Sequence, residues 1–319
     1  MTVMQTQKIT GKSVWKGSDF DQDGSWLHHF DETHIAAFDQ LLVELSERSI
    51  SFPDIVTTDI SMGIVGEMLD QISAELEYGR GFALLRGLPV NRYSEAELNT
   101  LFYAIGLHMG QPVYQNPKGD LLGKVMNVGD LTKKDTRVYE TNRYLPYHTD
   151  PSDVVGLLCV RKAKTGGMSS LVSAPAIYNA VLDRQPELLG VFYRPFCYAH
   201  LGEDKMSPIF SFHDGKLSCR YLRQYIELGY DQMGIPLSRI EKEALDLFDE
   251  IMMSPDMRID MMMEPGDIQF ANNYTVLHSR TSFEDYDDLD LRRKKLRLWL
   301  KMENARTLAP DFPGRNGFS

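Results

Sequence analysis

The chain has 319 residues, a hydrophobic content of 43% and a formal net charge of −11 at pH 7. This length is large for one domain, but a mainly β protein decorated with helices can reach it as a single unit with a sizeable core. The negative charge argues against duplex nucleic acid and anionic membranes as partners.

The sequence lacks the signals of a secreted, membrane-spanning or disulfide-bonded protein. No apolar run approaches the ~20 residues of a membrane span, and the polar stretch 1–16 lacks the apolar core of a signal peptide. The three cysteines, Cys159, Cys197 and Cys219, are too few and too scattered for a disulfide framework or a thiolate zinc site. We therefore expect a cytoplasmic protein in a reducing compartment, with no membrane partner and no nucleic-acid partner.

The first third of the chain is predicted to be largely helical. Apolar residues at helical spacing indicate one helix around 35–45 and a second over roughly 61–78. Residues 82–88 predict a buried strand, and the capping box at 94–97 predicts the start of a third helix. We expect residues 1–80 to form a mostly helical N-terminal part.

The rest of the chain alternates loops with β-rich segments. Residues 111–144 are rich in Gly, Asn, Pro and Tyr, which indicates long loops with short strands. The run 154–160 is continuously apolar, as expected of a buried strand. From 296 to 302, apolar side chains alternate with Arg297, Trp299 and Lys301, which is the period of a β-strand.

The order of these elements predicts the fold class and the domain organisation. Strands lie before and after a helical insert at about 173–255, and helices precede them all. This order favours an α+β protein that is mainly β, a double-sheet jelly roll backed by N-terminal helices. The jelly-roll core is expected over 81–302. Without an internal repeat or a convincing linker, the whole chain, 1–319, is expected to be one domain.

A His-x-Asp pair and a distant histidine carry the strongest chemical signal. In a strand, His148 and Asp150 point to the same face. With His278, they could give a metal two imidazoles and one carboxylate on one side, the facial set of non-haem Fe(II) oxygenases. The alternative for His148 and Asp150 is a surface turn, because His-x-Asp alone is common. The combination with His278 and the arginines that follow favours the metal site.

The basic run after His278 supplies the second signal. If the last strand already includes Arg293, then Arg293, Arg297 and Trp299 share one face. Such a face suits the inside of a ligand-bearing barrel, and a guanidinium can bind a carboxylate through two parallel hydrogen bonds. The alternative is a solvated basic cluster, since Lys294 and Lys295 lie in the same run. Together with an iron site, the arginines indicate 2-oxoglutarate.

Three blocks of sequence resemble the taurine dioxygenase-like (TauD/TfdA) branch of the Fe(II)/2-oxoglutarate-dependent oxygenases. The blocks are Tyr147 to Asp150, Lys164 to Ser169, and Gly266 through His278 to Arg297. The second block matches the Thr-Gly-Gly-x-Thr/Ser segment of the family. The resemblance extends over about 81–302 and implies a double-stranded β-helix of the clavaminate synthase-like type.

The resemblance implies roles for six residues and three cofactors. Fe(II) would be bound by His148, Asp150 and His278. The distal carboxylate of 2-oxoglutarate would pair with Arg293, with help from the Ser169 hydroxyl, and Arg297 would face cosubstrate or substrate. With O2, such an enzyme oxidises an unactivated C–H bond and releases succinate and CO2. The outcome in this family is hydroxylation, desaturation or ring closure.

The substrate signal is weaker. Gln111 stands where taurine-oxidising members have a sulfonate-binding histidine, and Tyr147 stands where they have tryptophan, so taurine is not the expected substrate. A small polar molecule with an apolar part, such as an amino acid, suits the neighbouring polar and aromatic side chains. Besides Arg297, the predicted substrate contacts are Gln115, Asn116, Tyr139, Asn142 and Tyr144. Ordinary loop positions remain the alternative for each of them.

Two other functions stay open from sequence alone. The jelly roll could be a non-catalytic ligand-binding protein that kept the fold and lost turnover. It could also be a Zn-dependent hydrolase, although such an enzyme has no need for the arginine pair. A homo-oligomer is also left open.

Overall fold

The computed structural model describes residues 4–129, 140–200, 203–312, 314 and 317–318. Its helices are α1 (Glu32–Glu47), α2 (Gly63–Tyr78), α3 (Glu95–Met109), α4 (Ala174–Arg184), α5 (Leu189–Phe192), α6 (Arg223–Met233) and α7 (Arg239–Met253). Among these helices, none combines the length and apolar character that crossing a membrane requires.

The strands follow the chain as β1 (Leu27–His29), β2 (Phe82–Arg86), β3 (Gly110–Pro112), β4 (Leu122–Met126), β5 (Leu145–His148), β6 (Val154–Arg161), β7 (Thr165–Gly166), β8 (Ser169–Ser173), β9 (Phe196–His200), β10 (Glu203–Ser207), β11 (Phe210–His213), β12 (Lys216–Cys219), β13 (Arg258–Met261), β14 (Ile268–Asn272), β15 (Val276–Arg280), β16 (Phe283–Glu284) and β17 (Lys294–Met302).

Two sheets build the core. The larger has seven strands in the order β1-β2-β14-β6-β17-β3, with β4 also paired to β17, and the smaller has the order β13-β8-β15-β5. Side chains from both sheets meet in one buried apolar cluster that includes Val155 and Trp299 from the larger sheet and Leu171 and Val276 from the smaller. The predicted jelly roll is confirmed by this arrangement of two facing sheets.

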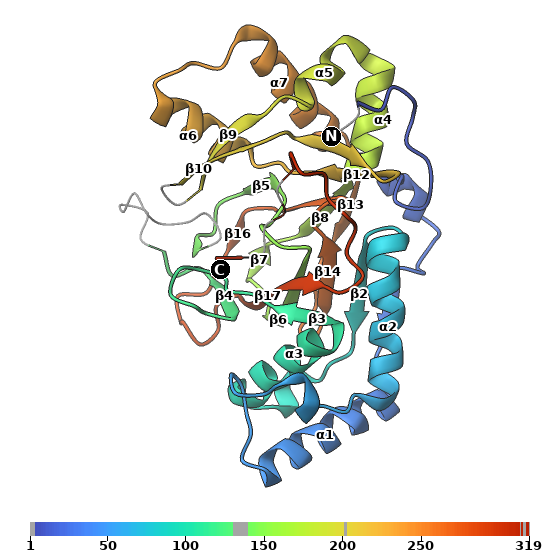
Figure 1. The fold of residues 1–319 in the computed structure, drawn as a ribbon. Helices are drawn as coiled ribbons and strands as arrows, with labels where there is room; N and C mark the ends of the chain where they lie inside the picture. Colours follow the sequence, from blue (N-terminus) through green and yellow to red (C-terminus); the bar gives the residue numbers. More distant parts are fainter. Residues whose placement is uncertain (1–3, 130–139, 201–202, 313, 315–316, 319) are drawn as a thin grey trace.

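Helices cover both outer faces, as Figure 1 shows with α1 to α3 at one end and α4 to α7 at the other. The outer face of the larger sheet packs against the first three helices in a cluster that includes Phe38, Leu69, Leu101 and Leu298. The smaller sheet buries Leu277 and other side chains against α4 to α7. Each sheet therefore buries apolar side chains on both faces.

Helix starts and strand positions agree with the sequence predictions in several places. The Ser94 side chain accepts a hydrogen bond from the Glu97 main-chain N–H, so α3 begins at Glu95 as the capping box predicts. The segment 82–86 forms β2. Between α4 and α7, however, the chain also forms two antiparallel hairpins, β9–β10 and β11–β12, which were not among the predicted elements.

Candidate active site

Strand register brings the three predicted metal ligands together. His148 ends β5, and it is the direct partner of His278 on the neighbouring strand β15. Asp150 lies two residues beyond His148, where its main-chain N–H donates to the Asn273 side-chain oxygen at 2.9 Å. Residues that are 130 positions apart in the sequence therefore meet because two antiparallel strands pair in this register.

The donor atoms of these side chains converge on one point. The Asp150 carboxylate lies 3.8 Å from His148 Nε2 and 3.6 Å from His278 Nε2. The two imidazole rings are 4.2 Å apart between centroids, and all three ligand atoms lie within 4.8 Å of one another. Two imidazole nitrogens and one carboxylate form a donor set that fits Fe(II) and leaves room for further ligands.

Neighbouring groups orient the ligands. The carbonyl oxygen of Pro146 lies 2.8 Å from His148 Nδ1. Because a carbonyl can only accept, Nδ1 carries the proton and Nε2 keeps its lone pair for a metal. Trp299 Nε1 donates to Asp150 Oδ2 at 2.9 Å. His278 Nδ1 is buried without a hydrogen-bond partner in the described part of the chain.

Charge states in this group also suit a cation. Burial and the neighbouring His278 lower the pKa of His148 to about 4, so its imidazole is neutral at physiological pH. Burial would raise the pKa of Asp150, but Arg297 and the two histidines outweigh it and hold that pKa well below its usual range. The centre therefore holds the charged Asp150 carboxylate beside the neutral His148 imidazole, both buried.

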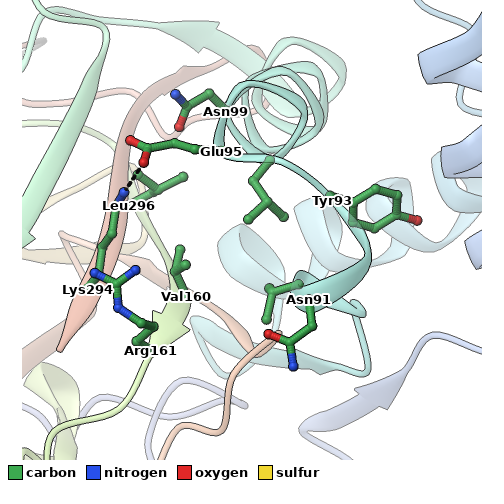
Figure 2. Close-up of a pocket in the computed structure, with 10 residues that line it drawn as sticks. Asn91, Tyr93, Glu95, Asn99, Val160, Arg161, Lys294 and Leu296 are labelled. Carbon is green, nitrogen blue, oxygen red and sulfur yellow. Dashed lines mark ion pairs between the residues drawn. The ribbon is translucent and has the colours of Figure 1, made fainter. Parts of the chain in front are cut away.

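Alternation along β17 decides which basic residues face this centre. Lys294 and Leu296 line a pocket against the start of α3, on the outer face of the larger sheet, where the Lys294 ammonium pairs with Glu95 at 2.7 Å (Figure 2). Arg293, Lys295 and Arg297 therefore face the opposite way, toward the inside. All four basic residues are 3% to 7% exposed, so a solvated basic cluster is wrong.

The predicted cosubstrate residues lie along this interior. Arg293 stacks over the Phe283 ring at 5.1 Å, and its Nη1 is buried without a partner among the described residues. Burial lowers the pKa of Arg293 to about 10, which leaves it charged. Ser169 donates to the Gln269 side-chain oxygen at 3.0 Å. Ser169 and Arg293 thus offer a hydroxyl and a buried guanidinium in the region predicted for the far carboxylate.

Arg297 connects the metal centre to Gln115. Its Nη1 lies 4.0 Å from Asp150 Oδ1, and its Nε donates to Gln115 Oε1 at 2.8 Å. Gln115 is 1% exposed, and its Nε2 is buried with no hydrogen-bond partner within the described residues. The structure therefore connects one of the predicted substrate residues to the centre through Arg297.

The other predicted substrate residues have different surroundings. The Asn116 side chain bonds Asp120 at 2.7 Å and the main-chain N–H of Lys118, which are contacts within its own turn. Asn142 is half-buried, and its carbonyl accepts from the Phe283 main-chain N–H at 3.0 Å. Tyr144 is 41% exposed. Tyr139 lies outside the described residues.

Sequence reasoning missed two interior cations. Arg280 follows His278 by two positions on β15, so the alternation used for His148 and Asp150 would have placed it on the same face. Lys295 lies on β17 between the two predicted arginines, and its ammonium contacts the Met263 sulfur at 2.7 Å. Alternation along β17 would have placed Lys295 inside, but a lysine within a basic run has the pattern of a surface residue.

Comparison with known proteins gives the family. The model of the taurine catabolism dioxygenase TauD, TfdA family matches residues 53–299. The chain is 34% identical over 318 residues to FR-33289 synthase from Streptomyces rubellomurinus, which covers 96% of this chain and 94% of the relative. It is 26% identical to the taurine hydroxylase-like protein SAT17 from Stachybotrys chartarum, over 91% of this chain and 79% of the relative.

Solved structures agree with the fold. An asparagine oxygenase in complex with Fe(II), 3-hydroxyasparagine and succinate superimposes with a TM-score of 0.67 at 16% identity, over 86% of this chain and 93% of that one. The non-haem iron oxygenase OrfP in complex with Fe and α-ketoglutaric acid gives 0.65 at 14% identity, over 86% and 94%. The chain belongs to the TauD, TfdA family and is a non-haem iron dioxygenase that uses Fe(II), 2-oxoglutarate and O2.

Proposed function

We propose that this enzyme oxidises an unactivated C–H bond of a small polar metabolite, by hydroxylation or by desaturation or cyclisation, with release of succinate and CO2. The observation that carries the proposal is the convergence of His148, Asp150 and His278, whose ligand atoms lie within 4.8 Å of one another beside a buried basic face. These three residues would hold Fe(II). When bound, iron with 2-oxoglutarate and O2 supplies the oxidising power that such a bond requires.

The protein side of this chemistry is binding, orientation and exclusion of water. Arg293 would pair with the far carboxylate of 2-oxoglutarate, a charge-assisted contact that is strong because the guanidinium is buried. Ser169 would add a hydroxyl donor to the same carboxylate. Trp299 holds one oxygen of Asp150, which fixes the carboxylate in the orientation that a metal needs.

The substrate would lie against Gln115 and Arg297. A buried Gln115 Nε2 without a partner in the described chain costs free energy unless a bound molecule accepts its hydrogen bond. Arg297, which Gln115 orients, would attract an acidic group. The other proposed contacts are Asn142, Tyr144, Tyr139 and Asn116. Of these, Asn116 is the weakest candidate, because its side chain already hydrogen-bonds Asp120 and the Lys118 main chain within its own turn. An amino acid or a related acid fits this set.

Membership in a dioxygenase family decides against the two alternatives, a non-catalytic jelly-roll binding protein and a Zn-dependent hydrolase. We also propose a cytoplasmic location, where a reducing compartment would keep iron ferrous. The observation in favour is that all three cysteines are free and buried.

An anaerobic titration tests the function. Fe(II) and 2-oxoglutarate are added to the metal-free protein while the visible charge-transfer band of the chelate is followed. Amino acids and small organic acids are then added one at a time. We expect a band that shifts with the right substrate. A folded protein that gives no band would contradict the proposed site.

A further inference from the structure

The inside of the barrel holds more positive charge than the two predicted arginines supply. Arg280 on β15 and Arg293 and Lys295 at β17 are 5%, 4% and 3% exposed. In the part of the chain that the structure describes, none of the three forms an ion pair with a carboxylate. Asp285 attracts Arg293 and Asp267 attracts Lys295 only at longer range, and the Lys295 ammonium contacts the Met263 sulfur. Buried charges without a close ion pair are costly, so a bound anion would stabilise this group of cations.

Arg280 has two ends with different surroundings. Its Nη2 donates to the carbonyl oxygen of Thr141 at 3.1 Å and to that of Arg143. Its Nε and Nη1 are buried without a hydrogen-bond partner in the described residues. The Arg280 guanidinium therefore holds the segment 140–144 through Nη2, while Nε and Nη1 remain available to a ligand.

The unused donors lie in the region of Arg293. The guanidinium carbons of Arg280 and Arg293 lie 4.7 Å and 5.1 Å from the centroid of the same ring, Phe283. Arg280 is also the direct cross-strand partner of Ser169, the hydroxyl proposed for the far carboxylate of 2-oxoglutarate. Arg280 thus borders the same space from the smaller sheet that Arg293 borders from the larger.

A comparison with Arg292 shows that this pattern is not that of a structural arginine. Arg292 donates through Nε, Nη1 and Nη2 to the carbonyl oxygens of Tyr286, Asn127 and Asp287. All of its nitrogens serve loops on the outside. Arg280 contacts its segment through Nη2 alone, and its other two donors are buried without a partner in the described chain. If Arg280 had only a structural role, these two unpaired donors would destabilise the fold with nothing to offset them.

We propose that Arg280 is a positioning residue that connects the cosubstrate to the segment 140–144. Its Nε and Nη1 donate hydrogen bonds to the far carboxylate of 2-oxoglutarate, and its Nη2 holds the segment through the carbonyl oxygens of Thr141 and Arg143. The inference rests on the proposed function and adds a residue to it. The segment carries Asn142 and Tyr144 and leads into β5, which ends at His148. A carboxylate that accepts from Nε and Nη1 would hold the planar guanidinium in one orientation and so keep Nη2 on the carbonyl oxygens of Thr141 and Arg143, and cosubstrate binding would thereby order the segment that would meet the substrate. By linkage, an ordered segment tightens cosubstrate binding in return.

The test uses Arg280→Gln, Arg280→Lys and the matched control Arg292→Gln, each on the full chain loaded with Mn(II) in place of iron. Calorimetry gives the dissociation constant of 2-oxoglutarate. Hydrogen exchange of the main-chain amides in 140–144, with and without 2-oxoglutarate, reports the order of the segment. Neither measurement needs turnover or a known substrate.

In the wild type, we expect 2-oxoglutarate to slow exchange in 140–144. Arg280→Gln should bind 2-oxoglutarate about tenfold more weakly, as expected for a lost charge-assisted hydrogen bond, and should lose the slowing. Arg280→Lys keeps the charge, so it should recover most of the affinity but not the slowing, because an ammonium lacks the guanidinium fork. Arg292→Gln should leave both measurements unchanged.

Two outcomes overturn the inference. One is wild-type affinity for 2-oxoglutarate in Arg280→Gln, and the other is equal exchange in the wild-type segment with and without the cosubstrate. If Arg280→Gln does not fold, the loss of slowing in Arg280→Lys answers the same question. A wild-type protein that does not bind 2-oxoglutarate overturns the proposed function itself, which separates the two failures.

Discussion

The two faces of β17 bury neighbouring lysines in opposite ways. Lys294 faces α3 and is 5% exposed, and its ammonium pairs with Glu95 at 2.7 Å. Lys295 faces the inside and is 3% exposed, with a methionine sulfur as its hydrogen-bond partner. On the outer face the lysine has a direct carboxylate partner; on the inner face, among the described residues, Asp267 attracts Lys295 only at longer range. The contrast separates a lysine whose charge is paired within the fold from one that is buried without an ion pair in the described chain.

The largest effect should come from removing the metal that the inner face surrounds. His148→Ala or Asp150→Ala should lower succinate formation roughly 1000-fold or more, because the remaining ligands cannot hold iron in a reactive position. Iron content and succinate formation are measured together, and thermal unfolding checks the fold. A variant that keeps wild-type turnover would remove that residue from the triad.

Arg293→Ala sharpens the comparison next. Truncating one partner of a buried charge pair costs several kcal/mol, so the KM for 2-oxoglutarate should rise roughly 100-fold while the KM for substrate changes little. Lys294→Ala, at the next residue but on the opposite face, is the control and should leave both constants near wild type. An unchanged cosubstrate KM in Arg293→Ala would place this arginine outside the binding site.

Lys295→Met tests the cost of the inner charge directly. Burial and the neighbouring Arg293 lower the pKa of Lys295 from 10.5 to about 7. The folded state binds this proton less tightly than the unfolded state, so the penalty is full below pH 7 and declines as pH rises toward 10.5.

Without cosubstrate, we therefore expect Lys295→Met to be more stable than wild type by about 1–4 kcal/mol at pH 7 or below. Denaturant unfolding at several pH values measures the difference, which should shrink as the pH rises. Lys294→Met should instead be slightly destabilised, since it loses the ion pair with Glu95. A pH-independent difference for Lys295→Met would mean that burial does not lower the pKa of this lysine.

The smallest effect belongs to Glu95 on the outer face. Hydrogen bonds from Lys294 and Lys124 lower the pKa of Glu95 to about 2. A lowered acid pKa stabilises the fold above pH 4.5, and the stabilisation is lost as pH falls from 4.5 through 2. The Glu95 side chain is 53% exposed, so water screens these pairs and Glu95→Gln should cost at most about 1 kcal/mol at pH 7. Equal stability of the two proteins at pH 7 would show that the pairs contribute nothing measurable.

Local sequence patterns predicted helix starts and strand faces, because these features depend on residues that are close in sequence. The capping box located the start of α3, and alternation placed Arg293 and Arg297 inside. The Asn-Pro-Lys-Gly-Asp run at 116–120 could have identified Asn116 as a turn residue, because its side chain bonds the main chain two residues on.

Features that depend on distant contacts could not be predicted in this way. The pairing of His148 with His278 on neighbouring strands was not predicted, since no local pattern sets a register across 130 residues; only their shared metal site was predicted, from the combination of residues and the family resemblance. The hairpin β9–β10 lacks strong alternation of its own, and β9 packs against α6. The hairpin β11–β12 could instead have been predicted locally, because Phe210 to His213 alternate and the turn Asp214-Gly215 has positive φ at both residues. The role of Gln115 beside Arg297 depends on where a loop closes.

Strict alternation along β17 constrains how this enzyme can diverge. A one-residue insertion early in the strand would turn Leu296 and Leu298 toward the carboxylate Asp150 and press guanidinium groups into the apolar contact with α3. Such an insertion would disrupt both the active site and the packing of the sheet against α3, so activity and stability would be lost together. Lineages that acquire new substrates are therefore expected to vary in the length and sequence of their loops, with β17 inherited at constant length.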